Sequence, residues 1–201
     1  MRKSYFAVLL SGVALLAGSS LGQIAGAEAA NRIRLRFEDS AAYNNGATVD
    51  LKSVLLKKRI ATKTDGSGSL SAILLLTNSE GLGCQADPDR PLASETEFVV
   101  GISLYESFQA KEGPEKTILH QMLYGGAKST GSTQSTTFRW EGDAAVLFRH
   151  GTGKPAWYTL AKGRAENGVT ILEKDGRTVL AIDFADPKLR VEGQVLPHHC
   201  P

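Results

Sequence analysis

Two histidines and a cysteine stand together at positions 198 to 200, and they are the residues here that could most readily do chemistry. Histidine and cysteine bind transition metals, but a tetrahedral site needs three or four converging ligands. The other histidines, His120 and His150, are isolated in the sequence. Neighbouring residues of an extended strand point to opposite sides, so His198 and His199 form a poor chelating pair. We therefore predict no metal site and no cofactor.

The same cluster contains one of the two cysteines of the chain, Cys84 and Cys200. A single pair of cysteines in an exported chain is typical of a structural disulfide. A bridge over so long a loop stabilises a fold by up to about 4 kcal/mol in the chain-entropy model. We predict that Cys84 and Cys200 form a disulfide that ties down the C-terminal segment.

Short catalytic motifs are missing from the sequence. The run GGAKST at 125–130 lacks the glycines of a phosphate loop, and DGSGS at 65–69 lacks the later glycine and glutamate of a calcium loop. Neither HExxH nor GxSxG occurs. A site assembled from distant residues stays open, with His120 or His150 as the base. The expectation therefore leans towards a protein that is not an enzyme.

Aromatic residues give a better indication of binding. Trp140 lies on one strand face with Phe138, and Trp157 and Tyr158 form a second cluster. Such side chains offer flat apolar area with a polar group, which suits sugar or protein contacts. Trp140, Trp157, Tyr158 and His150 are therefore the candidate ligand-binding residues. The competing expectation is that both tryptophans pack in the core and that Tyr158 reaches solvent.

Residues 125–147 partly resemble the motif pair of the periplasmic inhibitors of C-type lysozyme, SGxxY followed by KGxxAxL. Gly142, Ala145 and Leu147 match the second motif. Gly125, Ser129 and Glu141 replace the serine, the tyrosine and the lysine of the two motifs. That family consists of small β-barrels that bind a protein target, so the resemblance implies a partner-binding role.

The N-terminus is typical of a secretory signal. Arg2 and Lys3 precede an apolar stretch from Phe6 to about Ala17, which is too short to span a membrane. We predict a signal peptide over residues 1–29, cleaved after Ala27 or Ala29, and a periplasmic or secreted product without membrane insertion. Of 23 basic and 21 acidic residues, cleavage after Ala27 removes two basic ones. The resulting neutral charge argues against a nucleic-acid partner.

Residues 30–201 are expected to form one β domain, because apolar residues alternate in short runs between polar turns. We predict an antiparallel β-sandwich of about ten strands, with a closed barrel as the alternative. Residues 48–60 fit a strand or a helix, and we favour the strand. Residues 69–77 predict a buried central strand, and Thr117 to Tyr124 another strand.

Turn dipeptides at Asn167-Gly168, Asp175-Gly176 and Asp186-Pro187 predict three closing strands, at 169–173, 178–184 and 189–196. The run RIRLRF, residues 32–37, alternates strictly, which places three arginines on one face. These arginines indicate a solvated outer face, or a binding patch if they meet Lys57, Lys58 and Arg59 in space.

Together these observations predict an exported, non-enzymatic, ligand- or protein-binding β domain of the bacterial cell envelope. The alternatives are a periplasmic hydrolase with a dispersed active site and a structural or assembly protein. An envelope protein or a glycan is the expected partner, and the oligomeric state stays open.

Overall fold

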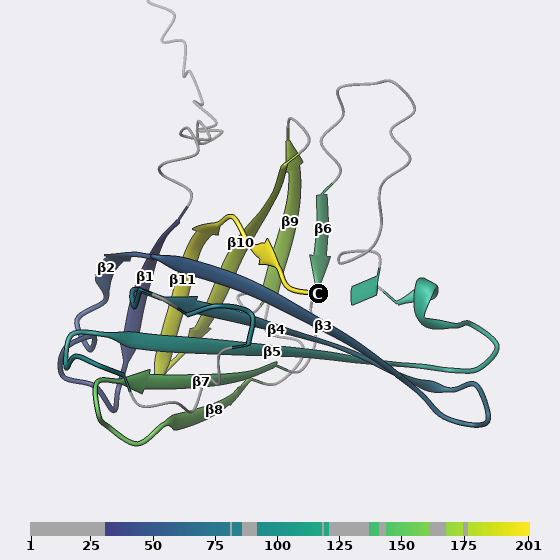
Figure 1. Ribbon diagram of the computed structural model, residues 1–201, viewed down its shortest axis with the longest axis horizontal. Helices are drawn as coiled ribbons and strands as arrows, with labels where there is room; N and C mark the ends of the chain where they lie inside the picture. Colours follow the sequence, from purple (N-terminus) through teal and green to yellow (C-terminus); the bar gives the residue numbers. More distant parts are fainter. Residues whose placement is uncertain are drawn as a thin grey trace, which may run out of the picture.

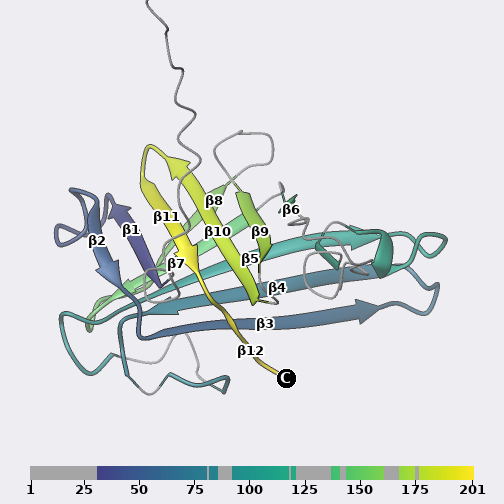
Figure 2. The same cartoon turned by 90° about the horizontal axis from the view of Figure 1, so that it is seen from above.

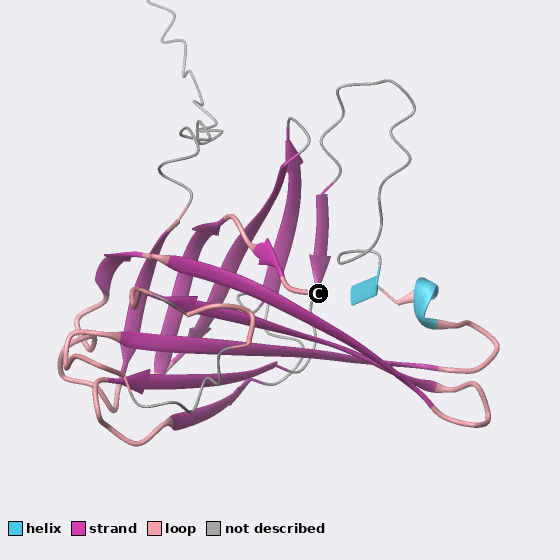
Figure 3. Cartoon of the chain, viewed as in Figure 1, coloured by secondary structure: helices cyan, strands magenta, loops and turns pink. Residues whose placement is uncertain are grey.

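The computed structural model describes residues 31–80, 82–85, 92–117, 119–120, 137–140, 144–160, 168–174 and 177–201. The predicted signal peptide, residues 1–29, lies outside them. The regular secondary structure of the described chain is almost entirely β-strand, and the strands form two six-stranded sheets (Figures 1 and 3). In spatial order, sheet A contains β2 (Ala47–Asp50), β1 (Arg32–Phe37), β11 (Leu189–Val195), β10 (Arg177–Asp186), β9 (Gly168–Lys174) and β6 (Thr137–Trp140).

Sheet B is the longer layer, and its central strands are ten or eleven residues long. In spatial order, it contains β12 (His198–His199), β3 (Ser53–Thr62), β4 (Gly68–Thr77), β5 (Phe98–Phe108), β7 (Ala144–His150) and β8 (Ala156–Leu160). The two sheets face each other, and Figure 2 shows that their strands cross at a large angle. They do not close into a barrel. The prediction of a sandwich is confirmed, and the barrel alternative is wrong.

The period-two alternation of the sequence determines which side chains enter the core. In β1, Ile33, Leu35 and Phe37 are buried while Arg32 and Arg34 are exposed. The ring of Phe37 stacks on the ring of Phe148 from β7, with centroids 3.8 Å apart. This contact joins sheet A to sheet B within one continuous apolar core.

One end of sheet B extends beyond sheet A, as Figures 1 and 2 show. Its inner side is closed there by the 3-10 helix η2 (Pro114–Lys116) and by Leu119, which is fully buried. The described part of the predicted strand Thr117 to Tyr124 is therefore not a strand. The Thr117 hydroxyl accepts a hydrogen bond from the His120 N–H at 3.0 Å, which is the pattern of a helix N-cap.

The other half of sheet B is covered on its outer side by a segment that we call the disulfide cap, residues 82–85, Leu92 and Cys200. The cap packs on Leu55, Leu75 and Val99. The Cys84–Cys200 disulfide predicted from the sequence is confirmed, with the two Cα atoms 5.4 Å apart. Strand β12 runs parallel to β3, and the Cys200 N–H donates to the Leu56 carbonyl at 2.9 Å.

Most of the predicted strands are confirmed. Residues 48–60 are extended, in β2 and β3 with a break at Leu51 and Lys52. Residues 69–77 form β4, in the interior of sheet B. Lys174 pairs with Arg177, so β9 and β10 form a hairpin around residues 175–176, which lie outside the described residues, as does Asn167. Asp186 and Leu189 close the last predicted turn.

Candidate functional site

A cavity of about 550 Å³ opens at the end of the sandwich that sheet A covers. Three loops and the adjoining ends of β7 and β8 enclose it, and we call it the end cavity. The loops come from the β1–β2 connection, from the segment before β5 and from the β7–β8 turn. Its lining residues are Asp39, Ser40, Ala41, Ala42, Glu95, Phe148, His150, Thr152, Gly153, Lys154 and Ala156.

Aromatic rings form the inner part of the end cavity. On β7 the inward positions end with Phe148 and His150, so the alternation that buries Phe148 brings His150 to the rim. Their rings are parallel, with centroids 6.4 Å apart. Tyr43 presents its edge to both, at 5.6 Å from Phe148 and 5.1 Å from His150. Burial raises the pKa of the Tyr43 hydroxyl, so this ring stays neutral at physiological pH.

Two carboxylates form the polar wall, and each accepts a short hydrogen bond from a hydroxyl. The Tyr158 hydroxyl donates to Asp39 Oδ2 at 2.6 Å, and the Thr152 hydroxyl donates to Glu95 Oε1 at 2.7 Å. Burial, followed by the hydrogen bond to Asp39, raises the pKa of Tyr158. The tyrosine therefore remains a donor that holds the Asp39 carboxylate in one orientation.

Gly151 allows the β7–β8 turn to approach Glu95. Its φ of 56° lies in the left-handed region, and a Cβ at this position would collide with the Glu95 side chain. The Gly151 N–H donates to the Glu97 carbonyl at 2.9 Å, which fixes the turn against the loop before β5. A glycine at the turn therefore brings Thr152 and Glu95 together.

The structure separates the four sequence-predicted binding residues. His150 lines the end cavity, and Tyr158 lies beside it through its bond to Asp39. Trp157 points away, to the outer side of sheet B. Trp140 belongs to β6, where it pairs with Val169 in sheet A, and its side chain lies outside what the structure describes.

The expectation about which aromatic residue reaches solvent is wrong. Trp157 is 62% exposed, whereas Tyr158 is only 8% exposed. The reason is the phase of β8, because Tyr158 shares its face with Leu160, which is buried in the core. His120 lies beside η2, in the segment that closes the opposite end of sheet B, so the two isolated histidines do not form one site.

Sequence reasoning missed the carboxylates of the end cavity. Asp39, Glu95 and Lys154 come from loops far apart in the chain, and no short motif connects them. Among the described residues, no group of three or more histidine, cysteine or acidic side chains is placed to hold a metal ion. In that same part of the chain, no helix is long and apolar enough to cross a membrane.

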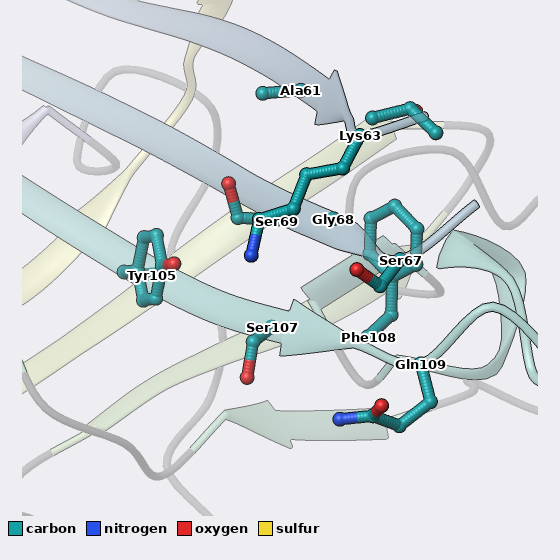
Figure 4. A pocket seen from close by; sticks show the side chains of 10 residues that line it. Ala61, Lys63, Ser67, Gly68, Ser69, Tyr105, Ser107, Phe108 and Gln109 are labelled. Atoms are coloured by element: carbon teal, nitrogen blue, oxygen red, sulfur yellow. The ribbon is translucent and has the colours of Figure 1, made fainter. Parts of the chain in front are cut away.

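A second hollow, of about 320 Å³, lies at the extended end of sheet B (Figure 4). Tyr105, Ser107 and Ser69 project into it from β5 and β4, while Lys63 and Gln109 stand where the strands end. We call it the face pocket. Tyr105 is 57% exposed, so its ring is available from solvent.

The arginines of β1 do not meet the basic run of β3. Arg32 and Arg34 lie on the outer side of sheet A, and Arg59 lies on the outer side of sheet B. The possible joint binding patch is therefore wrong. Acidic neighbours pair with the β1 arginines instead, at 3.2 Å between Arg32 and Asp50 and at 3.7 Å between Arg34 and Glu192.

Comparisons with known proteins add no relative. No protein-family model, curated protein or solved structure matches the chain.

Proposed function

We propose that this chain is an exported binding protein of the cell envelope, periplasmic or secreted, that holds a small ligand in the end cavity. The N-terminal pattern of residues 1–29 supports export, and the Cys84–Cys200 disulfide fits the oxidising compartment to which export leads. The observation that carries the binding role is the end cavity itself, which combines buried rings with oriented carboxylates.

The polar wall indicates the class of ligand. The Asp39 and Glu95 carboxylates accept hydrogen bonds, which favours a ligand with donors such as amine or hydroxyl groups. Lys154 lines the same cavity and can donate a hydrogen bond in turn. The hydroxyls of Tyr158 and Thr152 already orient these carboxylates, which reduces the ordering cost of binding. The rings of Phe148 and His150 offer an apolar surface to the rest of the ligand.

A hydrolase is the second candidate, because His150, Ser40 and two carboxylates line the same cavity. The hydrogen bonds in the cavity favour binding instead. They engage Asp39 with Tyr158 and Glu95 with Thr152, and among the described residues none joins His150 to Ser40. A nucleophile and its base are expected to lie within hydrogen-bonding distance of each other.

Filling the cavity tests the binding role. Ala156→Trp places a large ring in the end cavity, while Thr159→Trp adds the same ring on the outer side of the same strand. The protein is purified from exporting cells, and retained small molecules are identified by native mass spectrometry. A thermal-shift screen with small amines and polyols runs in parallel.

We expect the wild type and Thr159→Trp to bind, and Ala156→Trp to lose binding. Glu95→Gln removes one carboxylate without adding volume, and we expect it to weaken binding at least about tenfold, since a hydrogen bond to a charged group is worth about 1.5 to 3 kcal/mol. Absence of any retained or stabilising compound contradicts the binding role. Turnover in an ester or amide screen that disappears in His150→Ala establishes the hydrolase instead.

A further inference from the structure

The outer side of sheet B has a region that the disulfide cap leaves uncovered, and we call it the open face. It consists of the outward, alternate residues of 57–61, 69–73 and 103–107, together with Ala145, Trp157 and Thr159. Most of its central positions carry small hydroxyl or methyl side chains. Three large apolar residues stand exposed among them, Ile73, Tyr105 and Trp157.

Strand register places the exposed aromatic and cationic groups close together. Arg59 pairs with Ser71, and Ser71 pairs with Tyr105, so the three residues form one row across the sheet. Arg59 and Tyr105 therefore lie roughly 10 Å apart, with only a serine between them, from the usual spacing of strands. Trp157 lies two strands further along, roughly 15 Å from Tyr105 by the same geometry.

The face pocket continues this row at the free end of the sheet. Ser69 and Ser107 are opposite each other on β4 and β5, and both line the pocket with Lys63 and Gln109. The pocket thus presents two hydroxyls, an ammonium group and an amide within one shallow hollow beside the Tyr105 ring (Figure 4). These groups can donate and accept hydrogen bonds with a hydroxylated ligand.

The charged side chains of the open face are cationic. Its outward positions include Lys57 and Arg59 and no acidic residue. The acidic residue of β5, Glu106, faces the other way and accepts a hydrogen bond from the Leu119 N–H at 2.8 Å. At the hairpin tip the Asp65 carboxylate accepts both the N–H and the hydroxyl of Ser67, and these bonds, together with the nearby Lys63 ammonium, lower its pKa. Asp65 therefore offsets part of the Lys63 charge, and the net positive charge of the open face, which complements an acidic ligand, comes from its outward cations such as Arg59.

The shape of the open face favours a chain of sugars over a folded protein. A stable protein interface needs a broad, contiguous apolar core. Here Ile73 and Tyr105 are diagonal neighbours on β4 and β5, flanked by Ser71 and Ser103, and Trp157 stands apart two strands further along. Both aromatic rings offer flat platforms with a polar edge, and the small residues Ser103 and Ala145 leave the track between them shallow. An extended, hydroxyl-rich polymer can follow such a track from the face pocket towards Trp157.

From these observations we infer that the open face and the face pocket bind a linear polysaccharide that carries carboxylate groups. Tyr105 and Trp157 contact sugar rings, Arg59 and Lys63 contact carboxylates, and the serines bond to hydroxyl groups. This site is separate from the end cavity and does not depend on the ligand proposed there.

Affinity gel electrophoresis and calorimetry of the full mature protein test the inference with three polymers. Polygalacturonate is the acidic polysaccharide, dextran is the neutral one, and poly-glutamate is an acidic peptide. Tyr105→Ala and Arg59→Ala change the open face, and Arg32→Ala is the matched control because it removes an exposed arginine from sheet A. Ala156→Trp checks independence from the end cavity.

We expect polygalacturonate to bind, dextran to bind at least tenfold more weakly, and each open-face variant to weaken polygalacturonate about three- to tenfold. Arg32→Ala and Ala156→Trp should leave this affinity unchanged, and salt at about 1 M, where the screening length is about 3 Å, should abolish it. Three results would overturn the inference: no binding of polygalacturonate at low salt, equal loss in Arg32→Ala and Arg59→Ala, or equal affinity for poly-glutamate.

Discussion

The outer faces of the two sheets differ in the groups that they present to solvent. On sheet A, arginines alternate with the core residues and acidic side chains on neighbouring strands pair with them, as Arg34 does with Glu192. On sheet B, half of the face is covered by the disulfide cap, and the other half carries serines, aromatic rings and cations. Charges that are paired within one face attract a charged partner only weakly, whereas a face with an excess of cations keeps a positive electrostatic field.

The comparison teaches that strict alternation is not in itself a sign of function. Strands β1 and β4 both bury their inward positions, Ile33, Leu35 and Phe37 in β1 and the alternate residues 70–76 in β4. They differ in what the outward positions carry and in whether another segment covers them. The following four experiments test this difference, in order of decreasing effect.

Removal of the disulfide should have the largest effect and should act on one face only. In the double variant Cys84→Ser, Cys200→Ser, we expect the free energy of unfolding to fall by about 2 to 4 kcal/mol, because the unfolded chain regains its freedom. Denaturant unfolding measures this loss. Hydrogen exchange should accelerate in β12 and beneath the cap, around Leu55 and Leu75. An equal acceleration of hydrogen exchange in β1 and β11 would show that the cap does not stabilise sheet B alone.

Crowding at the free end of sheet B should have the next largest effect. A Cβ on Gly68 would meet the Ala61 carbonyl and the ring of Phe108. We expect Gly68→Ala to cost about 1 to 3 kcal/mol in the free energy of unfolding, as overpacking does elsewhere. Gly83→Ala is the matched control in the cap, since nothing lies within 4 Å of a Cβ there. Similar costs for both variants would argue against close packing of Phe108 on Gly68.

Protonation of Glu97 should loosen the loop that leads from the cap into β5. Its carboxylate accepts hydrogen bonds from the Ser79 hydroxyl at 2.8 Å and from the Ala93 N–H at 2.8 Å, and these bonds lower its pKa. A lowered pKa stabilises the fold fully above the ordinary value, near 4.5, and this stabilisation is lost as the pH falls through the lowered value.

Glu97→Gln should therefore lower the melting temperature at neutral pH, and the difference from wild type should disappear in acid. Thermal unfolding monitored by circular dichroism across this range measures the effect. Glu80→Gln changes an exposed residue that forms a 3.6 Å ion pair with Lys52, and it should shift the melting temperature little at neutral pH. A pH-independent effect of Glu97→Gln would contradict the charge-based explanation.

Single arginines should give the smallest effects on stability. Arg34→Ala removes an ion pair with Glu192 and a hydrogen bond to the Gly46 carbonyl, so we expect a loss of about 0.5 kcal/mol that salt diminishes. Arg59→Ala removes a cation from a face without acids, and the free energy of unfolding should stay equal or rise slightly. Denaturant titrations at low and high salt measure both free energies of unfolding. An equal loss of stability in both variants would contradict the proposed difference in charge pairing between the two faces.

Local alternation predicts much of this fold because each strand must bury one face. Residues 32–37 show this well, whereas residues 69–77 are predicted as a strand from their apolar density. The only two cysteines could be paired without any geometry. Alternation does not show which side chains face the core where neighbouring residues of a strand are both apolar. In β8, Trp157 and Tyr158 are both large, and only the buried neighbour Leu160 determines which of them faces the core.

The candidate sites could be predicted only in part. His150 could be named because histidine is a common catalytic base, and the structure places it on the end cavity. Asp39 and Glu95 were not found, because the crossing of the two sheets brings their loops together and sequence spacing contains no trace of that crossing. The row of Arg59, Ser71 and Tyr105 likewise depends on strand register, which follows from pairing partners distant in sequence.

The parallel pairing of β12 with β3 has a consequence for biogenesis. The edge of β3 receives its partner only when residues 198 and 199 have been made, and the thiol of Cys84 meets its own partner only at residue 200. Until then a nascent chain carries a reactive sulfur beside an unprotected strand, the combination that invites intermolecular pairing. Oxidation before residue 200 has been made should therefore yield dimers linked through Cys84. Slower synthesis of residues 198–200 should increase the number of these dimers.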